Sequence, residues 1–418
     1  MKIGAFAKQF DVSIDTVRYY IDLGLLVPGK QKTQYEMNQT CVEDMTFITE
    51  LKKLHFSLQE IHKILSYKRI THFREENDIH YFVNLLTEKK AKLAEELNQI
   101  AQTIQRIDQL IEETSKSQVQ EAGKGMPLTF MSYLYCPSCR VPLKMTAASI
   151  QQTSVHDGVL VCPCGYQAEL FEGILITDNV TTSPYHSCIY DEEIIKEWSP
   201  NLISLTEKSC LSMYKELSRH ELKQKLIVET NVDIFVSMTK YLPLLGEEVN
   251  YVFCGHSLEM MKRLKKRVEY SCPNATVLYI VNSDLQLPLR PQSIDYFVDS
   301  FSFNQFSLLN KRLPCEILAP YLHGDSRILG TYMFFAPASK SLKKIKEMYP
   351  DPHPKAYALG YLEENMDGLD AKRFQKEHVG QTDNPGSYFI YHVEQEMAHL
   401  YAYQYAYKER GEAIQSKP

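Results

Sequence analysis

Residues 12–28, VSIDTVRYYIDLGLLVP, decide how the first part of this 418-residue chain folds. Ser13 stands where a helix N-cap is expected and Asp15 falls in the first turn, so a helix should run to about Leu23. The preceding residues 3–9, IGAFAKQ, form a short segment with an apolar face. Two short helices joined by a tight turn indicate a helix-turn-helix, whose second helix can enter the major groove of DNA.

The second helix should divide into a buried and an exposed side. Helical spacing predicts that Ile14, Val17 and Ile21 are buried and that Thr16, Arg18, Tyr19 and Tyr20 are exposed. The following residues 24–38, GLLVPGKQKTQYEMN, alternate apolar and basic residues around a Pro-Gly turn, as a small wing would. Lysines at the tip of such a wing reach phosphates, which positions the protein without reading sequence. The predicted DNA-binding residues are Ser13, Thr16, Arg18, Tyr19, Tyr20, Lys30, Lys32 and Tyr35.

Residues 1–70 closely resemble the MerR family of transcription regulators. The family signature RYY…GLL.P is present in residues 18–28, and its GFSLxEI signature appears as HFSLQEI in residues 55–61. One departure concerns the wing, which in the family usually carries an arginine beside its tyrosine. Here residues 34–36 read QYE, so the phosphate contacts are expected to shift onto Lys30 and Lys32.

A heptad pattern follows in residues 76–115 and predicts a long helix with an apolar seam, interrupted only by Lys90. The seam consists of Leu86, Leu93, Leu97, Ile100, Ile104, Ile107 and Ile111. A lone helix cannot bury such a stripe, so it packs on its own chain or on a second copy. The MerR resemblance implies an antiparallel dimer helix here, and a dimer would read an inverted repeat in double-stranded DNA. Polar residues 116–130 are predicted to be a linker.

Four of the ten cysteines form two close pairs, Cys136 with Cys139 and Cys162 with Cys164. Two tight turns that each present two thiolates can close a tetrahedron, which predicts a zinc ribbon over residues 131–182 with a structural zinc ion. A redox pair would need a helix after the first motif, and Pro142 argues against one. Cysteines without a metal are the other alternative. The segment is similar to small zinc ribbons that precede S-adenosylmethionine-dependent methyltransferase domains.

In residues 183–418, apolar runs alternate with helical stretches, which predicts an α/β domain with a doubly wound parallel sheet. The expected strands lie in residues 225–236, 247–256, 275–284, 293–301 and 326–335. Residues 386–395 and 399–410 are further candidates for strands or a strand and helix. The alternating Tyr401, Tyr403, Tyr405 and Tyr407 suggest an edge strand with packing aromatics rather than a ligand cage.

The order of these segments looks like a class I methyltransferase domain. The resemblance implies a glycine-rich turn after the first strand, but residues 229–233 read ETNVD, and an asparagine and a β-branched valine there would crowd a cofactor. It also implies a carboxylate after the second strand, where Gly255 stands, whereas Asp284 matches the family's adenine-side aspartate. The predicted ligand cleft contains Glu229, Asn231, Ser257 and Asp284.

Composition bounds the possible functions. A hydrophobic content of 44% supports folded domains, and the net charge of −6 permits only a local basic face for DNA. We find no signal-peptide pattern and no apolar run of about 20 residues, so a cytoplasmic protein without membrane contact is expected.

These observations favour a dimeric MerR-type regulator, with residues 1–75 binding DNA, 76–115 dimerising, and a degenerate methyltransferase-like domain sensing an unknown small-molecule effector or a partner. S-adenosylmethionine is not expected to bind, and no catalytic residue is assigned. The alternative is an active S-adenosylmethionine-dependent methyltransferase fused to a DNA-binding arm. A metal or thiol sensor is a third possibility, although residues 112–130, where metal-sensing relatives carry cysteines, contain none.

Overall fold

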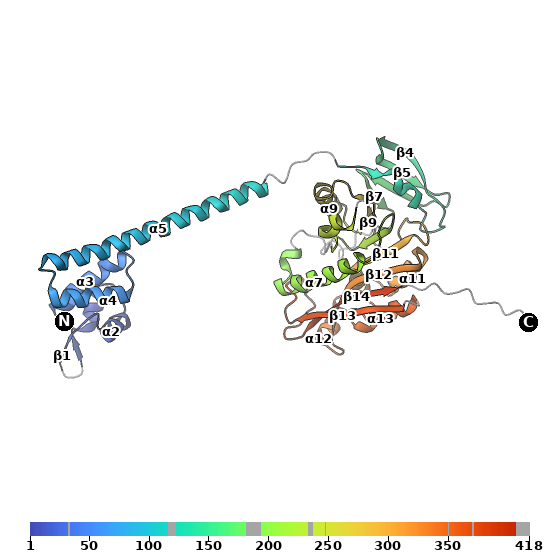
Figure 1. Cartoon of the computed structure of the whole chain (residues 1–418). Coiled ribbons are helices and arrows are strands. Elements are labelled where there is room, and N and C mark those ends of the chain that lie inside the picture. Colours follow the sequence, from blue (N-terminus) through green and yellow to red (C-terminus); the bar gives the residue numbers. More distant parts are fainter. Residues whose placement is uncertain are drawn as a thin grey trace, which may run out of the picture. The chain divides into compact units, whose positions relative to one another are not determined.

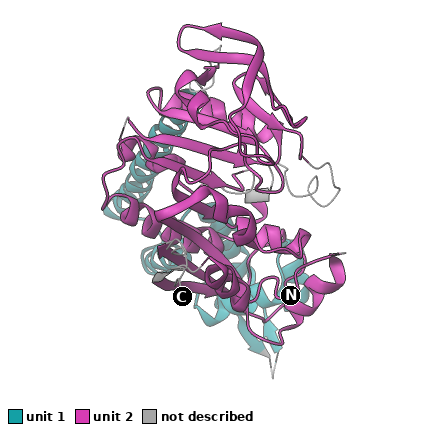
Figure 2. Cartoon of the chain, turned by 90° about the vertical axis from the view of Figure 1, so that its right-hand side faces the viewer, with its two compact units in different colours: residues 1–119 teal, residues 120–418 magenta. Residues whose placement is uncertain are grey.

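The computed structural model describes residues 1–31, 34–115, 123–180, 194–232, 237–246, 248–349, 351–369 and 372–406. Lys32, Asp233 and Tyr407, which the sequence singled out, lie outside these residues, as do residues 116–122 of the linker predicted at 116–130. The chain divides into two compact units, Met1–Val119 and Gln120–Pro418 (Figures 1 and 2). Within the described ranges, the structure has no helix that combines the length and the apolar character needed to cross a bilayer.

The first unit is helical and carries a small two-stranded wing. Its elements are α1 (Ile3–Gln9), α2 (Ile14–Asp22), β1 (Gly29–Gln31), β2 (Gln34–Glu36), α3 (Gln39–Lys53), α4 (Leu58–Thr71) and α5 (Glu76–Ser115). The core lies where α1 to α4 meet and includes Phe6, Val17 and Ile61.

The HFSLQEI signature has a structural explanation. Phe56 packs into the core, and Ser57 caps α4 by accepting a hydrogen bond from the amide of Glu60. The Glu60 carboxylate accepts in return from the amide of Ser57, at 2.6 Å, which completes a capping box. This amide and the Ser57 side chain lower the pKa of Glu60 to about 2. Lys89 of α5 bonds the same carboxylate at 3.2 Å and so ties α5 to α4.

The second unit contains a 12-stranded sheet. Its strands are β3 (Met126–Pro127), β4 (Lys144–Gln151), β5 (Ser154–Val161), β6 (Gln167–Phe171), β7 (Ile174–Thr177), β8 (Leu226–Thr230), β9 (Asn250–Gly255), β10 (Thr276–Val281), β11 (Ile294–Ser300), β12 (Leu322–Phe335), β13 (Lys372–Thr382) and β14 (Ala398–Ala406). They run in the order β13-β14-β12-β11-β8-β9-β10-β7-β6-β5-β3, and β4 pairs with β5. The antiparallel strands β4 to β7 therefore continue the main sheet, because β7 pairs in parallel with β10.

Strand residues of the sheet centre alternate between two core clusters, one on each face. Val228 and Val252 belong to one cluster, whereas Ile227 and Phe253 belong to the other. Helices α7 (Pro200–Leu217) and α9 (Leu258–Ser271) pack on the second face. Helices α10 (Ser302–Leu309), α11 (Pro314–Leu318) and α13 (Leu359–Gly368) pack on the first. The other described helical elements of this unit are short. They are η2 (Leu128–Tyr133), η3 (Ile194–Glu197), η4 (Thr239–Tyr241), α8 (Leu242–Leu245), η5 (Ala319–Tyr321) and α12 (Lys340–Met348).

The strand order reverses at β8. Strands β9 and β10 follow on one side of β8, and β11 and β12 on the other, all in parallel. In doubly wound sheets, ligands bind beyond the carboxyl ends of the strands at such a reversal. The fold therefore directs attention to the residues after Thr230 and Ser300.

Two strand predictions for the C-terminal segment were wrong. Residues 386–395 form turns, whereas β13 lies at 372–382, where the charged pattern KRFQKEHVGQT gave no strand signal. Strand β14 lies inside the sheet, antiparallel to both β12 and β13, and not at its edge. Tyr403 and Tyr405 are buried on β14, as predicted for packing aromatics. Long-range pairing decides these positions, so local pattern could not reveal them.

Candidate DNA-binding face, cysteine cluster and sheet cleft

Helix α2 presents a short polar face to solvent. Ser13 caps the helix by accepting from the amide of Thr16 at 3.0 Å, so it is held at the start of the helix. Arg18 is exposed and pairs with Asp15 at 3.2 Å, an exposed contact that leaves its guanidinium free to exchange partners. The Tyr19 side chain is 53% exposed and lies next to Arg18.

The prediction of an exposed Tyr20 was wrong. Tyr20 is 3% exposed and packs in the core, with its hydroxyl accepting from Lys52 at 3.2 Å. Tyr20 follows Val17 by three residues, so the two share the buried helix face. Ile14, which was expected to be buried, is exposed, and Thr16 and Ile21 are half-buried.

The wing, formed by β1 and β2, follows α2 in the chain, and Lys30 is its described lysine. Lys30 on β1 pairs across the strand with Tyr35 on β2, and its Nζ lies 5.6 Å from the centre of the tyrosine ring. Lys30 is exposed, whereas Tyr35 is half-buried. The ring therefore supports the lysine stem and leaves the ammonium group in solvent.

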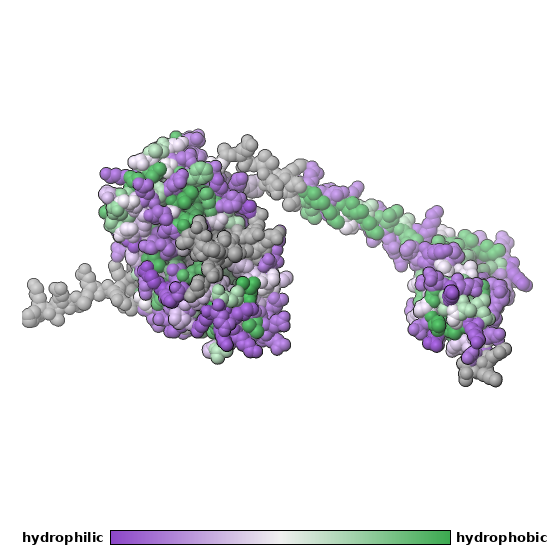
Figure 3. Space-filling model, turned by 180° about the vertical axis from the view of Figure 1, so that it is seen from behind, coloured by the Kyte–Doolittle hydropathy of each residue, from purple (hydrophilic) through white to green (hydrophobic). Residues whose placement is uncertain are grey.

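From Leu97 onward, α5 carries an apolar stripe that the described residues of this chain leave exposed. Leu86 packs against the core of the first unit and Leu93 is half-buried. The exposed members of the stripe are Leu97, Ile100, Ile104, Ile107, Leu110 and Ile111. Figure 3 shows hydrophobic residues gathered along one side of this helix.

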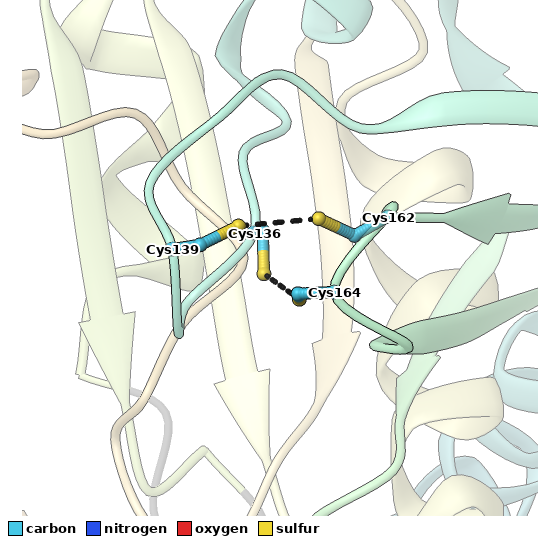
Figure 4. Close-up of side chains that lie close together, drawn as sticks. All are labelled: Cys136, Cys139, Cys162 and Cys164. Carbon is cyan, nitrogen blue, oxygen red and sulfur yellow. Dashed lines mark hydrogen bonds between the residues drawn. The ribbon is translucent and has the colours of Figure 1, made fainter.

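The four cysteine sulfurs converge between two loops (Figure 4). All four Sγ atoms lie within 4.8 Å of one another. The Sγ atoms of Cys136 and Cys164 are 3.5 Å apart, and those of Cys139 and Cys162 are 3.2 Å apart. Each short contact joins the first loop to the second, so each loop contributes one partner to each pair.

Backbone hydrogen bonds shape both loops into tight turns. The amide of Cys136 donates to Val141 at 2.8 Å, and the amide of Cys162 donates to Tyr166 at 2.9 Å. Gly165 adopts a φ of 97°, a conformation that residues with a Cβ rarely take, so this turn requires glycine. Burial raises the pKa of the Cys136 thiol, but amide donors at Cys139 and Ser138 outweigh burial and bring it to about 7.

The donor set fits a zinc ion. In a tetrahedral site with Zn–S bonds of about 2.3 Å, the sulfurs are about 3.8 Å apart, so only small adjustments would close the shell. Zinc there would hold the two loops together, and four thiolates leave no open position for a substrate. No other described group of three or more Cys, His, Asp or Glu residues has metal-ligand geometry.

A small hollow lies at the reversal point of the sheet, where about 20 Å³ is accessible to water-sized groups, and it is partly open to solvent. It is lined by Thr230, Asn231, Cys254, His256, Asn282, Ser283, Leu285, Ser302, Gln305, Phe306, Leu309 and Asn310. These residues lie at or just after the ends of β8, β9 and β10, or in and just after α10. We refer to this hollow as the switch cleft.

Of the four residues predicted for the cleft, Asn231 alone lines it. Glu229 is fully buried on the other face of β8, where it accepts from Ser237, Ser300 and Tyr251 at 2.6 to 2.9 Å. Burial raises the pKa of Glu229 despite these bonds. Ser257 caps α9, and Asp284 is engaged by Gln286 and Asn179. The alternation of side chains along a strand explains the error at Glu229.

The sequence reasoning missed several polar residues of the switch cleft. His256 directly follows the second strand, one position beyond the expected carboxylate at Gly255. Asn282 directly follows β10, and Gln305 and Ser302 lie in α10. The sequence did contain a signal for His256 and Asn282, because each is a polar residue that directly follows an apolar strand. Nothing local indicated that α10 closes the cleft.

Asp299, near the end of β11, holds the start of α10 in place. It is fully buried and accepts hydrogen bonds from Ser302 at 2.6 Å, from the amide of Phe303 at 3.1 Å and from Tyr403 at 2.5 Å. Ser302 in turn accepts from Thr230 at 2.8 Å. Burial raises the pKa of Asp299 to about 6, which the three donors only partly offset.

The first unit contains a MerR-type helix-turn-helix domain. Residues 1–68 match the family of MerR HTH regulatory proteins. Two curated relatives agree with this assignment. The HTH-type transcriptional regulator ZntR homolog of Haemophilus influenzae is 29% identical over 119 residues, which is 27% of this chain and 83% of that protein. The mercuric resistance operon regulatory protein of Bacillus cereus is 39% identical over 67 residues, which is 15% of this chain and 50% of that protein.

The second unit contains an α/β sheet that resembles methyltransferases. The seven strands β10-β9-β8-β11-β12-β14-β13, with β14 alone reversed, have the order of class I methyltransferases. Similar solved structures include the MccD protein, with TM-score 0.37, 10% identity and 47% and 96% of the two chains covered. Geranyl diphosphate C-methyltransferase from Streptomyces coelicolor A3(2) has TM-score 0.37, 12% identity and coverage of 53% and 98%. Likenesses this weak say nothing about activity.

Proposed function

We propose that this protein is a dimeric DNA-binding transcription regulator of the MerR type, with a C-terminal domain that senses a ligand or contacts a partner. The match of residues 1–68 to the MerR family carries the proposal. The described face of α2 supports it, because Arg18 and Tyr19 are exposed on the helix that would enter the major groove. Lys30 on the wing supplies a cation for phosphate.

Dimerisation is supported by the exposed stripe of α5. Six leucines and isoleucines from Leu97 to Ile111 lie on one side of a helix and are at least 48% exposed. Such a surface is costly in water, and a second copy of the same helix would cover it. A dimer would present two α2 helices and bind an inverted repeat of double-stranded DNA.

A sensing role for the second unit is supported by the switch cleft. The cleft lies where doubly wound sheets bind ligands, but Asn231 and Gly255 stand where a methyltransferase would place a bare turn and a carboxylate. The effector would therefore differ from S-adenosylmethionine. Structural zinc on the four cysteines would hold the adjoining strands β4 to β7.

DNA binding can be tested by gel shift. The probe is DNA that the wild-type protein selects from a random library. Arg18→Ala should lower affinity for the selected DNA at least tenfold and reduce discrimination against unrelated DNA. Lys30→Ala should weaken binding to all sequences and reduce the salt slope by about 1. Arg106→Ala, on the exposed part of α5, is the matched control. Unchanged affinity of the Arg18 variant would rule out α2 as the reading helix.

One observation favours the second candidate, an active methyltransferase fused to a DNA-binding arm. The order of the seven strands β10-β9-β8-β11-β12-β14-β13 resembles that of the class I methyltransferases. The order describes the scaffold, whereas the turn after β8 decides whether a cofactor fits. The two candidates are separated by the cofactor titration described in the Discussion.

A further inference from the structure

Residues 282–290, between β10 and β11, contribute to two sites at once, and we refer to them as the connecting loop. The first part of this loop lines the switch cleft through Asn282, Ser283 and Leu285. Its last part, residues 287–290, packs against the chain around the first cysteine pair. Because one short loop serves both places, a change at the cysteines has a direct route to the cleft.

The last part of the connecting loop is hydrogen-bonded to the residues that lead into the first cysteine turn. The amide of Tyr135, which directly precedes Cys136, donates to the carbonyl of Pro288 at 3.2 Å. The amide of Arg290 donates to the carbonyl of Tyr133 at 2.8 Å. These bonds belong to a short antiparallel bridge, so the stretch of chain that positions Cys136 also positions the loop.

The side chains at this contact share one core. Leu134, Leu287 and Leu289 are fully buried in the same cluster as Cys136. Tyr321 is buried there too, and its hydroxyl donates to the carbonyl of Leu287 at 2.7 Å. The first cysteine turn and the connecting loop therefore cannot move apart without exposing apolar surface to water.

The first cysteine turn adds a contact of its own through Arg140, which follows Cys139. The guanidinium carbon of Arg140 lies 4.7 Å from the centre of the Tyr321 ring. Arg140 has a φ of 59°, a conformation that costs free energy and that the turn imposes through a hydrogen bond from the Arg140 amide to the carbonyl of Cys136. Opening the turn would release this strain and withdraw Arg140 from Tyr321.

The first part of the connecting loop is held by β7, which belongs to the same cysteine segment, residues 131–182. Strand β6 begins just after the second cysteine turn and pairs with β7. Asn282 donates through Nδ2 to Thr177 Oγ1 at 3.3 Å and to Asn179 Oδ1 at 3.1 Å. Its Oδ1 accepts from the amide of Leu285 at 2.8 Å. The cysteine segment thus grips the loop at both ends.

We propose that metal loading of the four cysteines sets the conformation of the connecting loop and, with it, the lining of the switch cleft. Metal binding and folding are coupled at such sites, so loss of the metal frees both turns and the two ends of the loop that they hold. Because coupling between sites is reciprocal, whatever occupies the cleft also changes how tightly the metal is held. This proposal rests on the sensing role proposed above and adds its regulation.

Hydrogen exchange of the full chain, followed by mass spectrometry, measures the coupling in one direction. The reporting amides are those of Leu285, Leu287 and Arg290, which are hydrogen-bonded. In Cys164→Ser, which removes one exposed ligand, they should exchange about tenfold faster than in the zinc-loaded wild type. Amides of α7 should exchange at their wild-type rate. Cys272→Ser, which changes a cysteine outside the cluster, is the matched control and should match the wild type throughout.

Two exchange patterns would overturn the proposal. Faster exchange confined to residues 131–182 would mean that the loop does not respond to the cysteines. An equal increase in α7 would mean that the variant loses structure in general. A wild-type chain that holds no metal would overturn the proposal as well.

Zinc affinity measures the coupling in the other direction, and it decides if Cys164→Ser does not fold. Tyr321→Phe keeps the ring but removes the hydrogen bond to Leu287, so it should weaken zinc binding about threefold to tenfold in competition with chelators of known affinity. Tyr332→Phe is the matched control, because its buried hydroxyl likewise donates to a carbonyl, that of Ala358 at 3.1 Å. Equal zinc affinities of Tyr321→Phe and the wild type would contradict the coupling. Both measurements are made without DNA, so gel shifts test the DNA-binding role separately.

Discussion

Asp299 is a carboxyl group enclosed by three donors and cut off from solvent. Its partners come from distant parts of the chain, since Ser302 begins α10 and Tyr403 belongs to β14. Gly330 makes room for this contact, because a Cβ there would lie 2.6 Å from the Tyr403 ring and 2.7 Å from the Cβ of Asp299. A single buried acid thereby connects β11, α10 and β14 beside the switch cleft.

The raised pKa of Asp299 predicts a specific pH dependence. A folded-state pKa of about 6 against an ordinary 3.8 means that the folded protein holds this proton more tightly than the unfolded chain. The stabilisation is fully present below pH 3.8 and is lost as the pH rises through 6, for a total of about 3 kcal/mol. Asp299→Asn should remove this contribution, so the wild type should lose stability relative to the variant between pH 4 and pH 6.5.

Urea unfolding at a series of pH values, followed through Trp198 fluorescence, measures this difference. Glu60 provides the contrast, because its pKa of about 2 makes its contribution disappear as the pH falls. Comparing Asp299→Asn with the wild type at the same pH removes the contribution of Glu60, because both chains carry it. A constant difference between wild type and Asp299→Asn across this range would contradict the assignment.

Helix α5 is the element whose role depends most on a partner. Placing carboxylates in its stripe, as in the double variant Leu97→Glu and Ile104→Glu, should produce monomers, because unpaired charges at an apolar seam are costly to bury. Sedimentation velocity gives the readout. Gln102→Glu adds a charge on the opposite side of the same helix and should leave the dimer intact. A double variant that remains dimeric would place the interface elsewhere.

Zinc binding by the two cysteine loops can also be tested directly. Elemental analysis of carefully reduced protein should find one zinc ion per chain, resistant to mild chelation because a closed shell offers no open position. Cys162→Ser or Cys164→Ser should lower the zinc content and increase proteolysis within residues 133–180, since metal binding and folding are coupled at such sites. DNA binding by the first unit should persist.

Cys272→Ser is the control for the zinc test, because this cysteine lies outside the cluster and is buried near the end of α9. It should leave the zinc content and the proteolysis pattern unchanged. Finding no zinc, copper or iron in the wild-type protein would refute the metal site.

For the whole molecule, we predict no detectable methyl transfer and at best weak binding of S-adenosylmethionine. Asn231 fills the turn after β8 where a methionine moiety would lie, and Gly255, at the position of the ribose carboxylate, supplies none. Loss of that charged hydrogen bond alone would weaken binding about tenfold to a hundredfold. Calorimetric titration measures the affinity. Tight binding with an ordered cofactor between residues 229–232 and Asp284 would favour the methyltransferase candidate instead.

Sequence alone was sufficient wherever the determining interactions are local. Caps and helical spacing predicted α2 and its exposed Arg18, and the heptad pattern predicted the long helix α5. The spacing of the cysteines brought four sulfurs together, because each pair lies in one tight turn. The alternation of helices and strands predicted the sheet between β8 and β12.

Tertiary structure decided what depends on pairing between distant segments. Strand β13 exists because β14 pairs with it, although its own sequence is charged. The burial of Tyr20 depends on α3, whose Lys52 reaches its hydroxyl. The cleft residues separate because Glu229 and Thr230 face opposite sides of β8, so Glu229 is enclosed, while Asn231 lies beyond the strand and its positive φ turns the chain toward the switch cleft. Long-range packing, which no local pattern encodes, fixes each of these outcomes.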